Sequence, residues 1–576
     1  MLRPFVRAVL VSLFVSVVAL LVSLLDIFGQ NSDSARTSQA IFQLVTSSQY
    51  PKRPFSAREG QSDVRIVYIN DDTAKNMPKF ARWKGFPPTP DQQGEMIDFL
   101  LAPQFNIDSA GGVAEIEPAQ ILFLDFLYYG DGFSSPIEGQ DRFAKLLATI
   151  AAKTKSETWR AWGGCDDSPI QKLACIVEAE GTPIILAKPV AFGEAKFTDI
   201  QNKLDEIAVL VPVTAASSDY PLTYEQKRPP GKQLDKHQPI YPFDISPAYA
   251  IYAARCFQMT KGCNEPSLVP FLQRARVLKR HSLVAKAEGG DLPQVPRTGL
   301  SVVWGSHYSS LQKEMDRKTG GALAPCREFS FLEGFFASAF GPIGPGSGSK
   351  QVCLYTVSAT YDRLVTKINL HRGLLNQFLS GKIILVGAEL RGGNDWVESP
   401  INGQVPGVQY HAMALDNLIE RSLRGYRRQG GHWKGDWLEA GLLFVLTLIG
   451  LVTLMLRNGR HADTQAGQPF RASAYMPIYL GGLVVSLSTI SLVVLIGVAL
   501  QNTTTINWLA ILGISTGVTL LESGEALIHD FSGSLARHAT GRPIIGALLG
   551  FINLFDFSKV ALRRVAPKPT DHGDSE

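Results

Sequence analysis

The chain has 576 residues, of which 45% are hydrophobic and 19% charged, and its formal net charge is +4. This length gives room for one large domain or for two to three average ones, with a substantial core. So small a net charge does not indicate a nucleic-acid partner.

Four segments are long and apolar enough to be predicted as transmembrane helices, which need about 20 such residues. They are residues 8–28, 438–456, 476–500 and 506–521, and they leave residues 1–7, 29–436 and 523–576 outside the bilayer. The first segment is interpreted as an uncleaved anchor rather than a signal peptide, because it is long and no small-x-small cleavage site directly follows it.

Basic residues give the orientation of these spans. They precede the first span, fill the loop between the second and third, and recur in the tail, so these regions are predicted to be cytoplasmic. Residues 29–436 then lie in the periplasm or outside the cell. A basic run at residues 421–434 goes against this rule and is treated as an exception, since large blocks translocate largely regardless of charge.

All six cysteines lie in that external block, where an oxidising compartment would permit disulfides. They are Cys165, Cys175, Cys256, Cys263, Cys326 and Cys353. The preferred pairing is 165 with 175, 256 with 263 and 326 with 353, because each partner is the nearest in sequence. Unrelated buried thiols and a metal site are the alternatives, although no Cys-x-x-Cys pair supports zinc.

Within the block, short apolar runs alternate with helix-like segments. The predicted strands are residues 64–69, 121–126, 183–187, 208–213, 300–304 and 382–386, and the predicted helices are 94–101, 141–153, 246–257 and 409–419. Several strands are apolar on both faces, which is typical of strands covered by helices. The pattern predicts an α/β domain, with a parallel or mixed sheet and helices on both faces.

Three further segments interrupt or follow this pattern. Residues 214–243, rich in Pro, Lys and Gln, and residues 341–350, rich in Gly, Pro and Ser, are interpreted as insertions. In the tail, residues 543–565 are first apolar and then basic. This amphipathic segment predicts either an interfacial helix or a helix packed on a partner or on the spans.

Residues 381–408, GKIILVGAELRGGNDWVESPINGQVPGV, run from a β-branched strand into a glycine-rich turn, and a helix containing HAMALDNL follows. This order of strand, Gly-Ala turn, loop, Pro-Gly-Val turn and His-Ala helix resembles the second type of CHASE domain, a sensory extracellular module associated with cyclases and histidine kinases. Residues 67–72 and 122–127 are similar to that family's first two strands. The resemblance covers about residues 30–525. Relatives of this kind often carry a cyclase, kinase or phosphatase domain after the clustered spans, and the chain departs from them, so it is interpreted as a stand-alone form with three C-terminal spans and no output domain.

The glycines of this turn, Gly387, Gly392 and Gly393, raise the possibility of a phosphate cradle. Their spacing is not GxGxxG, and no Lys-Ser/Thr follows them, so neither a dinucleotide site nor a P-loop is predicted. A role in the turn and in packing is the preferred interpretation, with a ligand contact as the alternative.

Acidic residues recur where the predicted strands end, and ligands gather at the carboxyl ends of strands in open α/β sheets. The candidate ligand-binding residues are Asp71, Asp72, Asp125, Asp131, Arg391, Asn394, Asp395 and His411. The carboxylates suit a cation, an amine or acid/base chemistry. The alternatives are helix caps and turn formers for the acids, and a packed structural histidine for His411.

No Ser/His/Asp, Cys/His or HExxH constellation is recognised, so no catalytic residue, metal or cofactor is assigned and no enzyme activity is expected. The favoured function is a bacterial inner-membrane sensor, dimeric as such sensors usually are, that passes an external stimulus to a separate cytoplasmic partner. The alternatives are a pore-forming or membrane-perturbing effector gated by the external domain and, less favoured, a tethered extracytoplasmic enzyme.

Overall fold

The computed structural model describes the larger part of the external block and little else. The described residues are 50, 63–71, 73, 88–101, 104–107, 113–126, 138–189, 198–213, 220–225, 243–259, 265–280, 300, 302, 304–306, 308–319, 326, 352–368, 371–390, 395–399, 401–421 and 445. Among them no helix is long and apolar enough to cross a membrane. The four predicted spans, Val445 excepted, and the tail lie outside the described residues.

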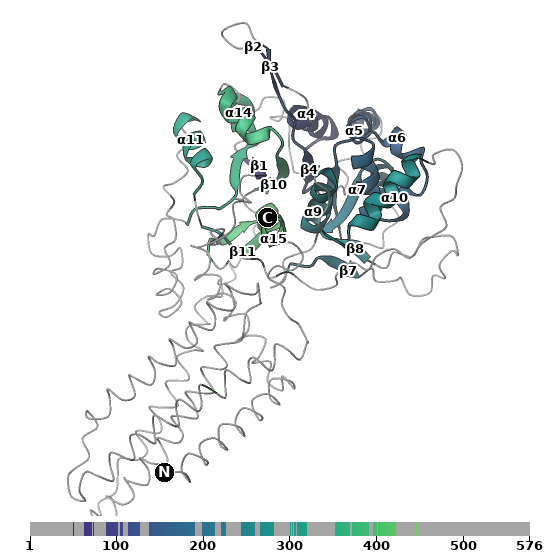
Figure 1. The fold of residues 1–576 in the computed structure, drawn as a ribbon. Helices are drawn as coiled ribbons and strands as arrows, with labels where there is room; N and C mark the ends of the chain where they lie inside the picture. The colour runs from purple at the N-terminus through teal and green to yellow at the C-terminus, as the bar shows by residue number, and fades with distance from the viewer. Residues whose placement is uncertain are drawn as a thin grey trace, which may run out of the picture. The chain divides into compact units, whose positions relative to one another are not determined.

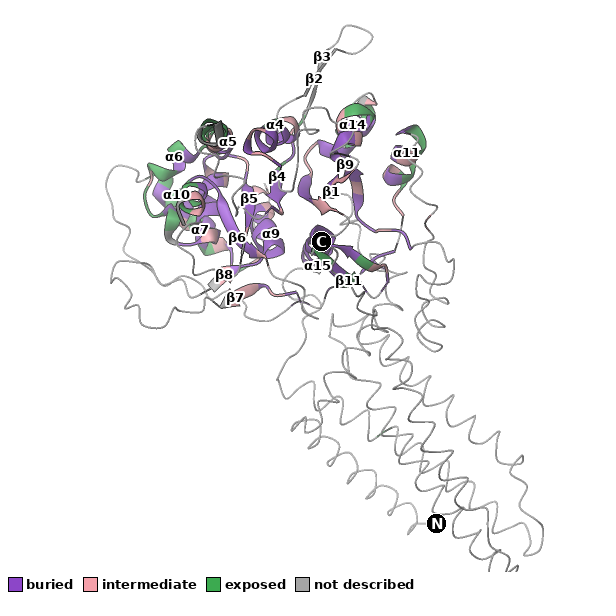
Figure 2. Ribbon diagram, turned by 180° about the vertical axis from the view of Figure 1, so that it is seen from behind, coloured by how far each residue is buried: buried purple, intermediate pink, exposed green. Residues whose placement is uncertain are grey.

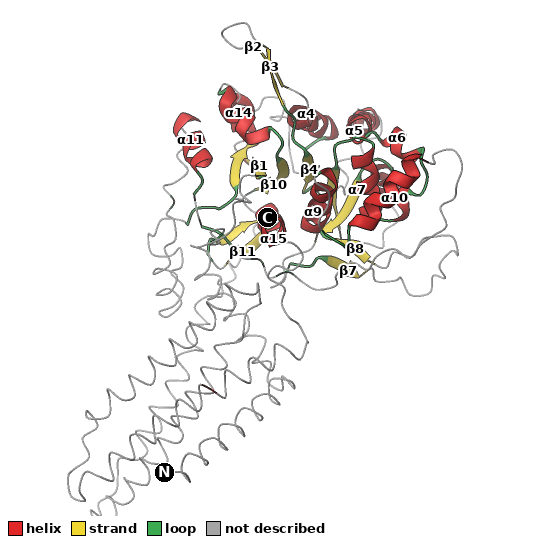
Figure 3. Cartoon of the chain, viewed as in Figure 1, coloured by secondary structure: helices red, strands yellow, loops and turns green. Residues whose placement is uncertain are grey.

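The chain divides into two compact units, one of Met1–Ala19, Gly441–Ser486 and Ile511–Glu576, the other of Leu20–Ala440 and Leu487–Ala510. A six-stranded sheet forms the centre of the second unit, in the order β6-β5-β4-β10-β1-β9 (Figures 1 and 3). Its strands are β1 (Val64–Asn70), β4 (Ile121–Leu124), β5 (Ile184–Pro189), β6 (Val209–Val213), β9 (Val357–Thr360) and β10 (Ile383–Glu389). All neighbouring strands are parallel, which confirms the predicted α/β class and decides between its parallel and mixed forms.

Helices cover both faces of this sheet, because its strands present apolar side chains alternately to each side. On β4, for example, Ile121 and Phe123 join one core cluster while Leu122 and Leu124 join the other. The first cluster includes α7 (Pro169–Glu178), α9 (Pro247–Gln258), α10 (Val269–Arg280) and α15 (Gly407–Arg421), and the second includes α4 (Pro90–Leu101), α5 (Glu138–Thr154), α8 (Thr198–Asp205), α11 (Ser310–Thr319), α13 (Tyr361–Thr366) and α14 (Arg372–Leu379). Figure 2 shows the strands largely in the buried colour.

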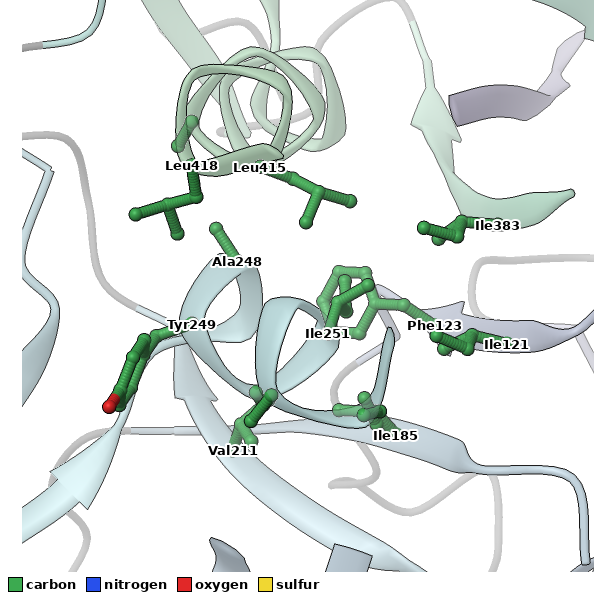
Figure 4. Packing of buried hydrophobic residues seen from close by; sticks show 14 of the residues in the cluster. Ile121, Phe123, Ile185, Val211, Ala248, Tyr249, Ile251, Ile383, Leu415 and Leu418 are labelled. Atoms are coloured by element: carbon green, nitrogen blue, oxygen red, sulfur yellow. The ribbon is translucent and has the colours of Figure 1, made fainter. Parts of the chain in front are cut away.

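On the first face, α9 separates the sheet from part of α15. Figure 4 shows Leu415 and Leu418 of α15 on one side of α9, and the strand residues Ile185 and Val211 on its other side. All four side chains are buried. This packing fixes α15 across the sheet, and α15 carries His411, Asp416 and Asn417, which are discussed below.

The predicted helices correspond to α4, α5, α9 and α15, and five of the predicted strands to β1, β4, β5, β6 and β10. The strand predicted at residues 300–304 is wrong. Leu300 forms only an isolated antiparallel bridge with Tyr220, while Val302 and Trp304 are buried outside any strand. Their alternating apolar pattern reflects packing rather than sheet pairing.

Other elements were not predicted. They are α6 (Ser156–Arg160), the 3-10 helix η3 (Cys165–Asp167), helices α7, α8, α10, α11, α13 and α14, strand β9, and the hairpins β2–β3 (Gln104–Ile107, Val113–Ile116), β7–β8 (Thr223–Glu225, Phe243–Ile245) and β11–β12 (Trp396–Ser399, Gly403–Pro406). Strand β7 lies inside the predicted insertion 214–243.

Two of the predicted disulfides, Cys165–Cys175 and Cys326–Cys353, are present. Cys256 is also disulfide-bonded, and its predicted partner Cys263 lies outside the described residues. These bonds exclude free thiols and a metal site as the role of the described cysteines.

Candidate functional site at the carboxyl edge of the sheet

The site is built where β10 meets the start of α15. Strand β10 continues through Gly387 to Glu389, so the turn predicted at Gly387 is wrong, because pairing with β1 extends the strand. A Cβ atom on Gly387 would lie only 2.5 Å from Cβ of Val408. Glycine at this position therefore lets the first turn of α15 approach the strand, as the packing interpretation predicted. Gly392 and Gly393 lie outside the described residues.

Helix α15 begins at Gly407, so His411 lies one turn inside the helix rather than opening it. Strands β11 and β12 form a hairpin directly before this helix. The N–H of Gly407 donates to the backbone oxygen of Asp395 at 2.9 Å, and the Asp395 carboxyl group occupies the space that a Cβ on Gly407 would need. Asp395 is thereby held against the helix start.

Asp125 and His411 meet at this edge. Asp125 directly follows β4, and its backbone N–H donates to the oxygen of Val386 at 2.8 Å. Its Oδ2 atom lies 3.8 Å from Nε2 of His411, and the two side chains are only 6% and 8% exposed. In the described part of the chain Oδ2 of Asp125 has no hydrogen-bond partner. A buried acceptor without a partner is unusual and points to an unmet interaction.

Tyr220 orients the histidine. Its Oη atom lies 2.8 Å from Nδ1 of His411 and accepts a hydrogen bond from the N–H of Ala248 at 3.0 Å. The tyrosine proton is then free to be donated to Nδ1, and in the tautomer that accepts it the ring proton of His411 lies on Nε2, on the side of Asp125. Burial lowers the pKa of His411 to about 3, so the ring is neutral near pH 7.

Aromatic rings enclose this histidine. Phe123 and Tyr220 meet its ring edge-on, with centroids 5.6 and 5.5 Å away. Tyr410 in turn lies edge-on to Tyr220 at 5.0 Å and stacks on Trp304 at 6.1 Å. Such packing leaves the imidazole one orientation.

Burial raises the pKa of both carboxyl groups of the site. Burial raises the pKa of Asp125 well above its usual value, and the negative charge of Asp395 raises it further. Asp395 is an exposed residue whose carboxyl group is enclosed against Gly407, and burial raises its pKa to about 6. The site can therefore hold or release protons, or hold a positive charge.

The structure thus brings together three of the predicted site residues, Asp125, Asp395 and His411. Asp71 follows β1, is partly buried, and is not among the groups whose charge shifts the pKa of Asp125. Asp72, Asp131, Arg391 and Asn394 lie outside the described residues. Tyr220 was missed, because nothing marks one tyrosine within a segment read as an insertion.

The far end of α15 carries a second polar contact. Oη of Tyr50 donates to Oδ2 of Asp416 at 2.5 Å, and Nδ2 of Asn417 donates to Tyr50 Oη at 3.4 Å. Burial raises the pKa of Asp416 to about 8, and the charge of Asp63, which directly precedes β1, adds to the increase. Helix α15 therefore runs from the carboxyl edge of the sheet toward its amino edge.

The fold and the site define the class of this protein. It contains a parallel α/β domain with a buried polar site at the carboxyl edge of its sheet. The family model of the CHASE2 domain matches residues 276–452, so the chain contains a CHASE2 domain, which belongs to a family of sensory extracellular domains. The match begins within α10 and includes β9, β10 and α15, but not β1, β4, β5 or β6. No curated protein and no solved structure matches the chain.

Proposed function

We propose that this protein is a membrane-anchored extracytoplasmic sensor. A stimulus acts at the site of Asp125, His411 and Asp395, and helix α15 carries the change toward the membrane, where a separate cytoplasmic protein receives it. The sensory CHASE2 domain supports the first step. The path of α15 supports the second.

The observation that carries this proposal is that one helix contacts both the candidate site and Tyr50. At its start, Val408 packs against Gly387 and His411 faces Asp125. At its end, Asp416 binds Tyr50, which lies between the first predicted span and β1. A displacement at the site therefore moves a rigid element that also holds this segment.

Energetically, the stimulus changes the balance between two arrangements only by its unequal affinity for them. The proposal places the protein in a bacterial inner membrane, with four spans, both termini in the cytoplasm and two copies in a dimer. It assigns the protein no catalytic activity of its own, so the output requires a partner.

Photocrosslinking from the predicted tail tests this function. A photoreactive residue is introduced at positions within 523–576 of the full chain in its own cells, and cytoplasmic proteins captured in living cells are quantified. The variant His411→Ala should change the yield of one captured protein by about fivefold or more, the lower range of ordinary site-to-site coupling. His371→Ala, which lies at the start of α14 on the opposite face of the sheet, should leave the yield unchanged.

Tyr220→Phe serves as a milder second variant, since it keeps the imidazole but removes its hydrogen-bond partner. The proposal is wrong if no tail position captures a cytoplasmic protein. It is equally wrong if the yield is the same in the wild type and in both site variants while all of them melt cooperatively.

A further inference from the structure

We propose that the carboxyl-edge site binds a small organic cation, a protonated primary amine, whose ammonium group lies between the carboxylates of Asp125 and Asp395. This inference rests on the proposed sensor function, because the amine would be the external stimulus. It names the chemical class of a ligand that the family match leaves open.

The first argument is the balance of charge. Oδ2 of Asp125 is buried and has no hydrogen-bond partner in the described part of the chain. The group whose charge acts on it is a second carboxylate, that of Asp395, and no described cation offsets the pair. Ionising a buried carboxyl group that feels the charge of a second one is unfavourable without a compensating positive charge. An ammonium group supplies that charge and several N–H donors at once.

The second argument concerns the neighbouring histidine. In the tautomer that accepts the Tyr220 proton at Nδ1, the ring proton of His411 lies on Nε2, the nitrogen nearer Asp125. At 3.8 Å the ring nitrogen is too far for a hydrogen bond to Oδ2 of Asp125, so this oxygen is left for the ammonium group.

A metal ion is the obvious competitor for two carboxylates, and the surroundings disfavour it. Among the described residues no three His, Cys, Asp or Glu side chains are arranged to hold a metal ion. An anion is disfavoured by the two carboxylates themselves. A ligand with one ammonium group needs only two acceptors and tolerates the aromatic rings nearby, since aromatic faces attract organic cations.

The two carboxyl groups differ in their exposure to solvent. Asp395 is exposed at the hairpin preceding α15, whereas Asp125 is almost fully buried. An amine therefore meets Asp395 first and Asp125 last. The position of Asp395 against Gly407, the first residue of α15, means that a bound cation acts directly on the start of this helix.

The test uses the full chain in lipid nanodiscs and three probes of equal chain length: butylamine, butanol and butyrate. Thermal unfolding is followed by tryptophan fluorescence at one pH near 7.5. Butylamine should raise the unfolding midpoint by about 2 °C or more, which corresponds to about 1 kcal/mol for a domain larger than 150 residues. Butanol and butyrate should not.

The variants Asp125→Asn and Asp395→Asn should each abolish the butylamine shift. Glu398→Gln is the matched control, because it removes one negative charge from an exposed position on β11, in the same hairpin as the site, and should keep the shift. Asn is isosteric with Asp, so Asp125→Asn preserves packing, and its cooperative melt checks folding. Because Asp395 is exposed, Asp395→Asn should not disturb the core, so its loss of the butylamine shift tests the site independently of folding.

The inference is overturned if the three probes act equally, if butyrate stabilises more than butylamine, if magnesium or zinc ions stabilise more, or if both Asn variants keep the butylamine shift. Tail crosslinking separates this result from the sensor function. When butylamine fails but His411→Ala still changes the crosslinking yield, the ligand class is wrong and the sensor stands. When the butylamine shift is lost in Asp125→Asn but crosslinking never responds, the site stands and the sensor does not.

Discussion

Helix α15 buries two ionisable side chains in an uncharged state. His411 is neutral because burial lowers its pKa to about 3, and Asp416 is protonated near pH 7 because burial raises its pKa to about 8. Burying a charge without a close partner costs several kcal/mol, so each side chain keeps the form that water would not favour. Each also makes a hydrogen bond to a tyrosine, His411 to Tyr220 and Asp416 to Tyr50.

Asp416 makes stability depend on pH. Its pKa is 3.8 when it is exposed to water, as in the unfolded chain, and about 8 in the folded protein. Between these pH values the folded state therefore binds one proton more than the unfolded state. The stabilisation that protonated Asp416 contributes is therefore fully present below about pH 4 and is lost as the pH rises through about 8. Asp416→Asn cannot ionise, so its unfolding midpoint should fall less steeply between pH 5 and about 9 than that of the wild type.

The control for this experiment is Tyr50→Phe. It removes the hydrogen bond but leaves the burial that is the main cause of the shift, so it should lower stability and keep the steep pH dependence. An unchanged slope in Asp416→Asn would show that another group is responsible.

The bond between Tyr220 and His411 predicts a measurable coupling. Tyr220→Phe leaves Nδ1 of His411 and the N–H of Ala248 without this partner, which should cost about 1–3 kcal/mol of unfolding free energy. In a double-mutant cycle with His411→Ala, measured by urea unfolding, the two costs should be non-additive by about 0.5 kcal/mol or more. Additive costs would mean that the bond contributes nothing.

Individual site residues could be predicted from the sequence, but their spatial arrangement could not. Asp125, Asp395 and His411 were predicted because acids follow strands and a histidine lies in a motif. Their meeting depends on β10 pairing beside β4, which no local pattern encodes. Tyr220 offered no signal, since its role depends on the bridge to Leu300 and the neighbouring start of α9.

At the scale of elements, β10 and α15 approach each other closely at Gly387. Gly387→Ala would push its new methyl group against Val408, so it should lower the unfolding free energy by about 1–3 kcal/mol, as overpacking does. The double variant Gly387→Ala/Val408→Ala should regain part of this loss. Urea unfolding of the three variants measures both effects.

Gly373→Ala is the matched control. Gly373 lies in α14, and an added Cβ would meet nothing within 4 Å, so this change should be neutral or stabilising by about 0.5–1 kcal/mol. If both alanine variants behave alike, close approach does not explain the glycine at position 387.

Elements with a strong apolar period were predicted, and elements without one were missed. Helix α11 buries only Gln312, Met315 and Thr319, so it carries no apolar stripe. The opposite error arose at residues 300–304, where Leu300, Val302 and Trp304 are buried at alternate positions outside a strand. Periodicity reports burial, and burial is not always pairing.

For the whole molecule, the family match and the folded unit have different extents. Strand β10 lies within the matched residues 276–452, but both of its neighbours, β4 and β1, lie outside them. The matched strands β9 and β10 do not touch, because β1 separates them. The matched region therefore cannot build the sheet from its own residues.

This separation predicts that residues 276–436 alone will not fold. Strands β9 and β10 would each lose their partners, and their unpaired backbone groups would be exposed. Circular dichroism with urea should show no cooperative transition for this fragment, whereas residues 29–436 should show one. A cooperative transition in the shorter fragment would contradict the sheet order.

The sequence by itself determined the α/β class, the pairing of Cys165 with Cys175 and of Cys326 with Cys353, and the membership of the motif at residues 381–408 in a CHASE2 domain. These follow from local patterns, because period, spacing and motif need only nearby residues. The tertiary structure alone decided that β10 enters between β1 and β4, and that Asp125, Tyr220 and His411 meet. Contacts between residues far apart in the chain depend on how the core packs, and no short stretch of sequence contains that information.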